Sequence, residues 1–336
     1  MSAQTLRVET EKWRLSAPFR ISGFVFKELD VVVVTIEEGR HRGRGEAAGV
    51  YYLGDDVHTM VAAIEAVRPE IEQGVDRAGI QQLLTPGGAR NAVDCALWEL
   101  DARRLGVPVW ELAGLTAPKP LVTTFTLGAD DPKAMAAAAR THAQAKSLKL
   151  KLTGDLQTDV ARVRAVRAAR PDVWMGVDAN QGYGIDALDS LIAALLPANI
   201  SLLEQPLQRG READLEGFKS PIPIAADESV LSLQDIPGLA GRFDVVNIKL
   251  DKCGGLTEGL AMAREARRMG LGVMVGNMVG TSLAMAPAFV LGQLCDVVDL
   301  DGPIFLSRDR TPSMTYSNGS AWSGEHVWGG TRASPA

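Results

Sequence analysis

The sequence predicts an α/β fold in which a small α+β cap precedes a barrel of parallel strands. From about residue 120, short β-prone runs alternate with Ala-rich helical segments such as residues 132–145 and 256–269. The runs end about 25 residues apart, the length of one strand, one helix and two short loops. Such ends lie near Thr126, Lys151, Asp178, Glu204, Asp227, Lys249, Asn277 and Asp301. Eight units of this kind predict a TIM-type barrel whose strands all end at one mouth.

The predicted cap begins with an antiparallel meander. Between residues 6 and 45, β-prone runs such as VVVVTIEEG alternate with turn residues. Helical periodicity follows over residues 57–73 and 91–104. Residues 18–26 and 45–56 are loop-like stretches rich in glycine and aromatic residues, so both are candidates to cover a pocket.

The predicted boundaries place the cap in residues 1–115, the barrel in residues 116–310 and a tail in residues 311–336. Glycines and prolines in residues 105–120 are typical of a linker. The tail is rich in Gly, Ser and Trp, and we expect it to return and pack on the cap. A doubly wound open sheet is the alternative to the barrel; no GxGxxG motif follows the first strand, and eight units fit closure better.

Composition limits the class of partner. The formal net charge of −6 and the pI near 5.4 argue against nucleic acid, because phosphate binding requires a basic face and none is evident, so we expect a small-molecule ligand. Cys95, Cys253 and Cys295 form no CxxC pair and are expected to be buried thiols in a reducing cytosol. The charged N-terminus does not resemble a signal peptide, and residues 283–291 are too short to span a membrane and read as a buried helix. We expect a cytoplasmic protein without a membrane partner, either monomeric or homo-oligomeric.

Two lysines share one face of a predicted strand. In LKLKLTGD (residues 148–155), Lys149 and Lys151 are two residues apart within an apolar run. Burying two ammonium groups is costly unless each meets an anion or takes part in chemistry. An isolated pair of this kind is more often a solvent-facing edge strand protected by lysines.

Carboxylates end three successive strands, which favours a buried, functional role for the two lysines over an exposed edge strand. Asp178 lies in MGVDANQGY, Glu204 in SLLEQPL and Asp227 in IAADES. A single acid at a strand end is as often a helix N-cap, but three that converge at a barrel mouth are hard oxygen ligands of the kind Mg²⁺ prefers. Asn180 and Glu228 are expected to support these ligands.

A third lysine completes an arrangement for proton transfer. Lys249, in NIKLDKCGG, ends the strand that lies across the barrel from Lys151, so the metal would sit between two amines. Two such groups can remove a proton from one face of a carbon and return it to the other. Mg²⁺ would stabilise the enediolate that forms beside a carboxylate. Lys149 is expected to lower the pKa of Lys151 and to contact the substrate carboxylate.

The motifs KLK, VDAN, LLEQP, ADES and NIKLDKCGG together resemble the enolase superfamily, muconate-lactonizing-enzyme subgroup. The resemblance implies a modified TIM barrel of (β/α)7β type with a capping domain completed by the C-terminal tail. It implies Asp178, Glu204 and Asp227 as ligands of Mg²⁺, and Lys151 with Lys249 as the acid/base pair. The four histidines, at positions 41, 58, 142 and 326, fall outside the strand ends, which disfavours the histidine-based mechanism of mandelate-racemase-like members.

The eighth strand bears on the choice of reaction. In VVDLDGP, Asp299 and Asp301 share one face, which resembles the dipeptide epimerases of the L-Ala-D/L-Glu type, where such a pair holds the N-terminal amine of the substrate. The alternative is that Asp301 only forms an Asp-Gly-Pro turn. Further substrate contacts are expected from Thr126 and Asn277. Whether Arg20 or the loop with Tyr51 and Tyr52 sets specificity stays open, with Phe19 and Phe24 as further candidates for an apolar lining.

The function expected is a Mg²⁺-dependent dipeptide epimerase that carries out a two-base 1,1-proton transfer at the α-carbon of the C-terminal residue. An N-acylamino-acid racemase and a β-elimination lyase resembling o-succinylbenzoate synthase are alternatives within the same superfamily. A binding protein that keeps the barrel without turnover is a third alternative.

Overall fold

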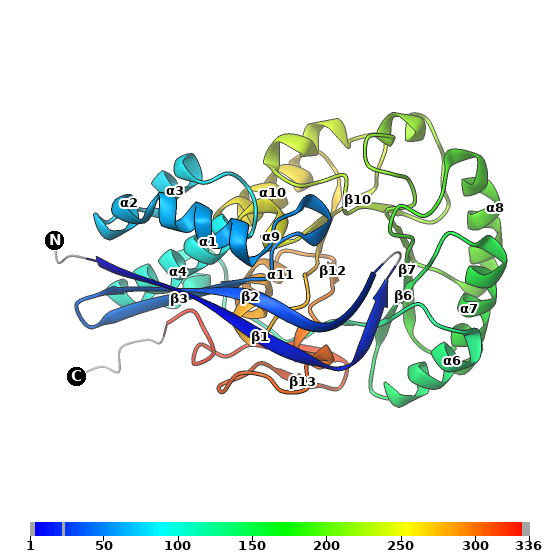
Figure 1. The fold of residues 1–336 in the computed structure, drawn as a ribbon. Coiled ribbons are helices and arrows are strands. Elements are labelled where there is room, and N and C mark those ends of the chain that lie inside the picture. The colour runs from blue at the N-terminus through cyan, green and yellow to red at the C-terminus, as the bar shows by residue number, and fades with distance from the viewer. Residues whose placement is uncertain (1–3, 22–23, 331–336) are drawn as a thin grey trace.

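The computed structural model describes residues 4–21 and 24–330, apart from the side chains of Arg20, Ile21 and Phe24. A cap and a barrel lie side by side, with the cap at the left of Figure 1 and the barrel at the right. The predicted fold class is confirmed: an antiparallel sheet precedes an eight-stranded parallel sheet that curls into a barrel. None of the helices in the described part is both long and apolar enough to cross a membrane.

The cap is a three-stranded antiparallel sheet covered by helices. Its strands are β1 (Gln4–Ile21), β2 (Phe24–Glu38) and β3 (His41–Ala47), and its helices are α1 (Val57–Ala66), α2 (Arg68–Glu72), α3 (Arg77–Leu83), α4 (Gly88–Leu105) and α5 (Val109–Leu112). The helix expected over residues 57–73 is divided at Val67, and Pro69 lies in the first turn of α2. Proline lacks the backbone N–H that would continue the hydrogen bonds of α1, so it favours the start of a second helix.

Strand β2 is buried on both faces because its valines alternate between two cores. Val32, Val34 and Ile36 pack with the cap helices, whereas Val31 and Val33 pack in the core that the cap shares with the barrel. This run explains why the cap sheet is fixed to the barrel. Charged residues could not take these positions without the cost of burying an unpaired charge.

Helix α4 lies directly on β3, and two glycines permit that contact. A Cβ added to Gly43 would stand 1.9 Å from the carbonyl oxygen of Ala96, and one added to Gly45 would stand 2.0 Å from that of Ala92. The close packing places α4 between the cap sheet and the barrel.

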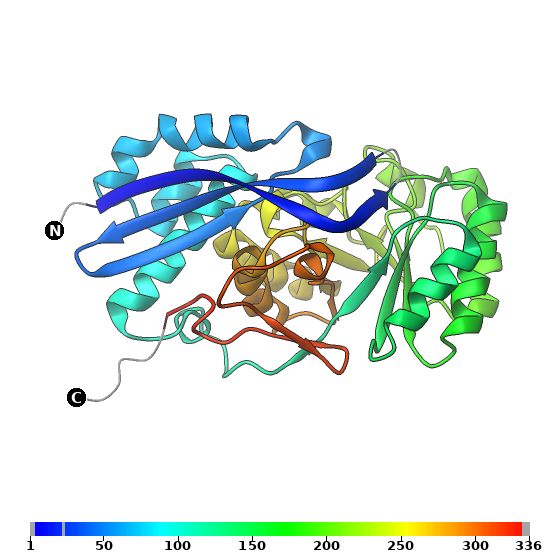
Figure 2. The ribbon, with the colours of Figure 1, turned by 60° about the horizontal axis from the view of Figure 1, so that its bottom comes forward.

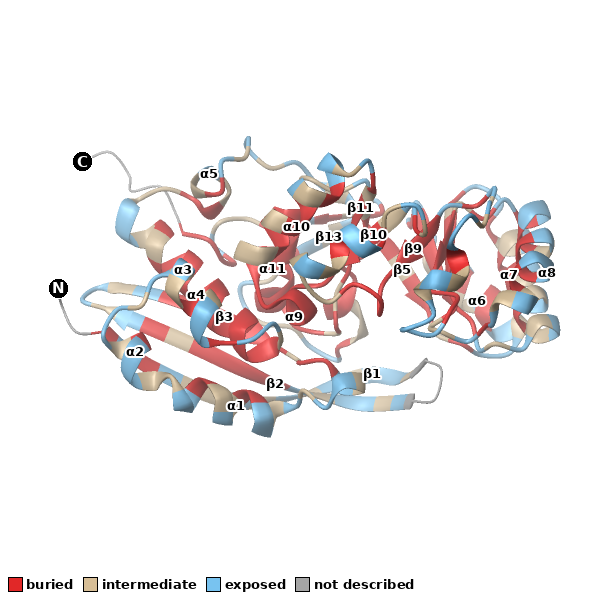
Figure 3. Cartoon of the chain, turned by 90° about the horizontal axis from the view of Figure 1, so that it is seen from above, coloured by how far each residue is buried: buried red, intermediate tan, exposed pale blue. Residues whose placement is uncertain are grey.

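The barrel strands are parallel and follow one another in sequence order. They are β5 (Thr124–Leu127), β6 (Ser147–Lys151), β7 (Trp174–Asp178), β8 (Leu202–Glu204), β9 (Ile224–Ala226), β10 (Val245–Ile248), β11 (Gly272–Val275) and β12 (Val297–Val298). The helices that cover them are α6 (Pro132–Thr141), α7 (Leu156–Ala169), α8 (Ile185–Leu195), α9 (Leu250–Cys253), α10 (Leu256–Arg268) and α11 (Ser282–Gly292). Every residue of α11 is buried (Figure 3), which confirms the prediction of a buried helix there.

Two of the expected βα units lack a full helix. Only the short 3-10 turns η3 (Glu212–Leu215) and η4 (Leu233–Gly238) follow β8 and β9. Gly210 and Gly217 have left-handed backbones in the first connection, and Pro237 lies within the second turn. Such residues stop helices from extending.

The barrel is closed between β12 and β5 by side chains. The backbone N–H of Leu300 donates to Oγ1 of Thr123 at 2.9 Å, and that of Thr126 donates to Oδ2 of Asp301 at 2.6 Å. We refer to these two hydrogen bonds as the seam. The other neighbouring strands are joined by backbone ladders over the described residues.

The chain termini connect the two units. Figure 2 shows β13 (Thr315–Ser317) and β14 (Ser320–Trp322) beside the start of the barrel, where β14 pairs with β4 (Leu121–Val122). Farther along, the tail reaches the cap, since Nε1 of Trp328 donates to the carbonyl oxygen of Arg44 at 2.8 Å. At the other end, the β1–β2 hairpin extends beyond the cap toward β6 and β7.

Candidate active site

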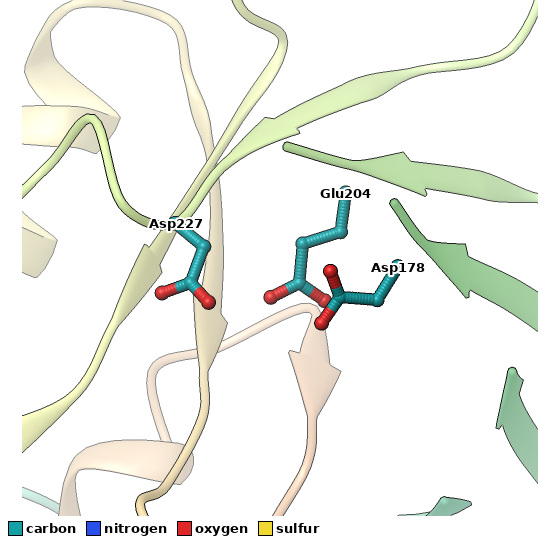
Figure 4. Close-up of side chains that lie close together, drawn as sticks. All are labelled: Asp178, Glu204 and Asp227. Carbon is teal, nitrogen blue, oxygen red and sulfur yellow. The ribbon is translucent and has the colours of Figure 1, made fainter. Parts of the chain in front are cut away.

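The three predicted carboxylates converge at the carboxyl ends of β7, β8 and β9 (Figure 4). Asp178 and Glu204 are the last residues of their strands, and Asp227 directly follows its strand. One ligand atom from each lies within 4.8 Å of the others, and all three residues are buried. The parallel register of the strands therefore brings together residues that are about 25 positions apart in the chain.

The charges of this triad fit a divalent cation. Burial and the neighbouring Asp178 raise the pKa of Glu204 to about 8. Burial acts in the same direction on Asp227, but Lys249 and Lys252 outweigh it and lower the pKa of that carboxyl. Oε2 of Glu204 accepts no hydrogen bond from the described residues. A buried carboxylate oxygen that accepts no hydrogen bond, close to two further carboxylates, is the kind of ligand that Mg²⁺ prefers.

The two candidate bases lie beside different members of the triad. Nζ of Lys151 is 2.5 Å from Oδ2 of Asp178, and Nζ of Lys249 is 2.6 Å from Oδ2 of Asp227. Their strands, β6 and β10, are four places apart in the eight-stranded sheet and so lie across the barrel from each other. Burial lowers the pKa of Lys249, but the carboxylates of Asp227 and Glu204 outweigh it and raise that pKa.

Lys149 pairs with the Asp-x-Asp motif across the seam. Its ammonium group contacts Oδ2 of Asp299 directly and lies 3.4 Å from Oε2 of Glu204. Asp299 also accepts a hydrogen bond from the hydroxyl of Thr124. Lys149 is therefore held by protein carboxylates. The predicted contact of Lys149 with a substrate carboxylate, and its influence on the pKa of Lys151, stay predictions.

The two aspartates of the motif differ in environment. Asp299 is ion-paired, whereas Asp301 accepts the backbone N–H of Thr126 and has no ammonium or guanidinium nitrogen within 4.0 Å among the described residues. Burial and the charge of Asp299 raise the pKa of Asp301 to about 7. Asp301 is thus the member of the pair that would gain more from an incoming cation.

These groups line one cavity of about 480 Å³ between the cap and the barrel mouth. The polar residues that line it include Thr126, Lys149, Lys151, Asp227, Lys249, Asn277, Asp299 and Asp301. Its apolar wall consists of Leu15, Phe19, Phe26, Leu29, Tyr51, Tyr52, Met278, Val279 and Phe305. Nδ2 of Asn277 donates to the backbone oxygen of Asp299 at 2.6 Å. The side chains of Arg20 and Phe24 lie outside the described residues, so their predicted roles stay predictions.

Two supporting residues were missed in the sequence. Nζ of Lys252 donates to Oδ1 and to the carbonyl oxygen of Asp227, and Nδ2 of Asn247 donates to Oε1 of Glu204 at 2.7 Å. The signal was present in NIKLDK, where Asn247 and Lys252 flank Lys249. Asn180 was expected as support, and its backbone N–H donates to Oδ1 of Asp178 at 2.9 Å.

Known proteins resemble the chain over nearly its whole length. L-Ala-D/L-Glu epimerase of Escherichia coli K12 is 40% identical over 318 residues, which cover 94% of this chain and 98% of the relative. N-acetyl-D-glutamate racemase of a Pseudoalteromonas species is 38% identical over 305 residues, which cover 88% and 96%.

Solved structures of similar proteins also match the chain over nearly its whole length. An enolase family member from Agrobacterium tumefaciens, described as homologous to dipeptide epimerases and holding sodium and L-Ala-L-Glu, is 40% identical with a TM-score of 0.92 and covers 97% of this chain and 100% of its own. The dipeptide epimerase of Methylococcus capsulatus, complexed with Mg and L-Arg-D-Lys, is 30% identical with a TM-score of 0.89 and covers 96% and 97%.

Family models match both units of the chain. The N-terminal domain of the mandelate racemase / muconate lactonizing enzyme family matches residues 3–114, and the enolase C-terminal domain-like family matches residues 133–310. With the buried acidic triad and the relatives above, these matches show that the chain belongs to the mandelate racemase / muconate lactonizing enzyme family of the enolase superfamily.

Proposed function

We propose that the chain is a Mg²⁺-dependent epimerase that inverts the α-carbon of the C-terminal residue of a dipeptide. The observation that carries the proposal is the placement of two buried lysines on opposite sides of one acidic triad, at 2.5 Å and 2.6 Å from two of its members. Relatives named as dipeptide epimerases and the Mg-dipeptide complex of one of them support the same conclusion.

In this proposal Asp178, Glu204 and Asp227 hold the cation. Bound there, Mg²⁺ supplies positive charge that makes an α-proton beside a carboxylate more acidic. Lys151 and Lys249 then act from opposite faces of the α-carbon. One amine takes the proton while the opposite ammonium delivers one, so the configuration inverts. A substrate that fills the cavity between the cap and the barrel mouth would displace water and so strengthen these electrostatic interactions.

Asp301 supplies the proposed contact to the substrate amine. It is buried, lies at the seam, and has no cationic partner among the described residues. A dipeptide ammonium would remove the cost of that unpaired carboxylate. Thr126 and Asn277, which line the same wall, are the proposed contacts for the peptide backbone.

An N-acylamino-acid racemase is the second candidate. The N-acetyl-D-glutamate racemase relative favours it, and so does the ion pair of Lys149 with Asp299, because a neutralised aspartate has less to gain from a substrate amine. The chemistry at the α-carbon would be the same, and only the group beside Asp301 would differ.

The test is deuterium uptake in D₂O with Mg²⁺. A dipeptide library and matched N-acetyl amino acids are incubated separately, and incorporation at the α-carbon is followed by mass spectrometry. Uptake and inversion at the C-terminal residue of dipeptides support the proposal. Uptake restricted to N-acetyl substrates supports the racemase instead. The Lys249→Ala variant tests the second base, because inversion should fall about 10²–10⁴-fold while deuterium uptake through Lys151 can persist for one epimer.

The proposed setting is a cytoplasmic enzyme. Cys95, Cys253 and Cys295 are free thiols, the first two buried, which suits a reducing compartment. A homo-oligomer is compatible with the proposal, and sedimentation velocity would measure the state directly.

A further inference from the structure

We propose that Asp251 is a positioning residue that ties the cap loop over the active site to the short helix that follows Lys249. These hydrogen bonds would keep Lys249 and the loop at fixed positions relative to each other on the two sides of the cavity. The inference rests on the proposed two-lysine proton transfer and adds a residue that acts through Lys249 without touching the substrate.

The tie crosses from the barrel to the cap. Oδ1 of Asp251 accepts hydrogen bonds from the backbone N–H of Ala48 at 2.9 Å and of Gly49 at 3.1 Å. Both loop residues line the cavity, as do Tyr51, Tyr52 and Lys249. A single buried carboxylate therefore joins the wall of the cavity to the element that carries one candidate base.

Helix α9 depends on contacts of this kind for its position. It has four residues, Leu250–Cys253, and Lys249 is its N-cap. A helix this short is not stable by itself, so its tertiary contacts determine where it lies. On the side of the metal site, Lys252 donates to Asp227, and on the side of the cap, Asp251 accepts from the loop. Lys249 is thus fixed from two directions.

Close contacts within the loop on the cap side connect Ala48 and Gly49 to the aromatic pair that lines the cavity. Gly49 has a φ of +74°, and an added Cβ would stand 2.3 Å from the carbonyl oxygen of Asp55. Oδ2 of Asp55 accepts the backbone N–H of Gly88 at 2.8 Å. The ring of Tyr51 packs edge-on against Tyr52, with centroids 5.2 Å apart. A shift of Ala48 and Gly49 would therefore carry this aromatic pair with it.

Stability alone does not account for Asp251. It is 5% exposed, and no Lys, Arg or His nitrogen lies within 4.0 Å of it in the described part of the chain. Asp159 also accepts backbone N–H groups on a loop after a lysine-bearing strand, but Arg162 pairs with it at 2.7 Å. A buried carboxylate without a cation is costly, and that cost points to a functional role.

A two-base mechanism makes the role measurable. Displacing Lys249 slows inversion of both epimers equally, because the equilibrium constant links the two directions. Deuterium uptake with retention of configuration is not linked in this way. The epimer whose α-hydrogen faces Lys151 can still exchange through Lys151, whereas the other epimer loses exchange. A smaller folded fraction would lower every rate by one common factor.

The experiment compares Asp251→Ala with Asp251→Asn, which keeps an Oδ1 acceptor. In Asp251→Ala, we expect the epimer whose α-hydrogen faces Lys151 to exchange with retention at a rate within about two-fold of the wild type. Exchange with retention from the other epimer should fall about ten-fold or more, since a small displacement of a catalytic group is costly. Asp251→Asn should restore the wild-type ratio. In parallel, amide hydrogen exchange over residues 48–54 should speed up in Asp251→Ala alone.

Asp94→Ala is the matched control. Asp94 is also a buried aspartate between cap and barrel, and it accepts the backbone N–H of Thr257 at 3.0 Å, but it does not line the cavity. Its variant should lower exchange of both epimers by one factor. Equal losses in Asp251→Ala, the same asymmetry in Asp94→Ala, or unchanged amide exchange over residues 48–54 would each overturn the inference. A wild-type enzyme that exchanges no dipeptide would overturn the proposed function instead, while faster amide exchange would still report the tie.

Discussion

At the scale of single residues, the active site contains two aspartates whose sequence context is nearly the same and whose surroundings differ. Asp299 and Asp301 are two positions apart, yet only Asp299 pairs with Lys149. The sequence predicted the shared face of these residues, because alternation along a strand is a local property. It did not predict the pairing, because Lys149 and Asp299 are 150 positions apart and meet only when the barrel closes.

Replacing Asp301 with Asn tests its proposed contact with the substrate amine. We expect kcat/KM for dipeptides to fall about 10–100-fold, the range for losing one charged partner of a buried ion pair. The kcat/KM for N-acetyl substrates should change little, because they carry no ammonium group. Steady-state kinetics with L-Ala-L-Glu and N-acetyl-L-Glu gives both values, and an equal loss for the two would argue against the contact.

Asp251→Asn should make folding stability depend differently on pH. Burial raises the pKa of Asp251 from 3.8 to about 7. A carboxyl whose pKa rises on folding favours the folded state below its unfolded pKa, and that advantage is lost as pH rises through the folded pKa. Ionisation above pH 7 thus costs the wild type about 4 kcal/mol that the Asn variant avoids.

The measurement is urea unfolding of both proteins between pH 4 and pH 8. The stability of Asp251→Asn relative to the wild type should increase across this range and level off above pH 7. A difference independent of pH would show that the buried carboxyl does not change its protonation on folding. Asp130→Asn, at an exposed position, controls for the change in net charge.

At the scale of elements, the sequence predicted the strands better than the connections. Each strand end is a local apolar run followed by a polar residue, so β7, β8 and β9 were placed correctly. The helices expected after β8 and β9 are only short turns, because the Ala-rich periodicity seen elsewhere gives way there to Gly and Pro. The contact between α4 and β3 was also missed, since it depends on glycines whose role appears only in the packed structure.

Gly43→Ala tests that contact. The added methyl group would collide with backbone atoms of Ala96 and Leu100, and backbone cannot move aside as a flexible side chain does. Overpacking of this kind costs about 1–3 kcal/mol or more. Thermal unfolding should show a clearly lower Tm than in Gly238→Ala, where nothing lies within 4 Å of an added Cβ. Equal Tm values for the two variants would contradict the packing argument.

At the scale of the whole molecule, the site belongs to the barrel more than to any one segment. The triad draws one carboxylate from each of three strands, so a bound cation would link those strands. The sequence predicted this convergence because strand order in a parallel barrel follows chain order. It also indicated two cap segments that cover the mouth, since Phe19, Tyr51 and Tyr52 line the cavity. It did not predict the lining by Leu15 and Leu29, because that depends on how the cap sheet packs against the barrel.

Mg²⁺ should therefore stabilise the global fold. At a concentration 100 times the Kd, binding to the folded state alone adds about 2.7 kcal/mol to the free energy of unfolding. Differential scanning calorimetry with Mg²⁺ and with EDTA should show a higher Tm with the cation. Glu204→Gln should abolish the shift, whereas Glu216→Gln, at an exposed position, should keep it. A shift that persists in Glu204→Gln would place the cation elsewhere.

The seam gives the barrel an unusual dependence on its own ligand. A backbone ladder joins neighbouring strands elsewhere in the described barrel, whereas side-chain hydrogen bonds of Thr123, Asp301 and the Thr124–Asp299 pair link β5 to the segment that follows β12. The carboxylate proposed to bind the substrate amine thus also helps to close the barrel. Separation of β5 from β12 would then be the barrel motion that responds most to substrate binding. An occupied site would hold these two strands together.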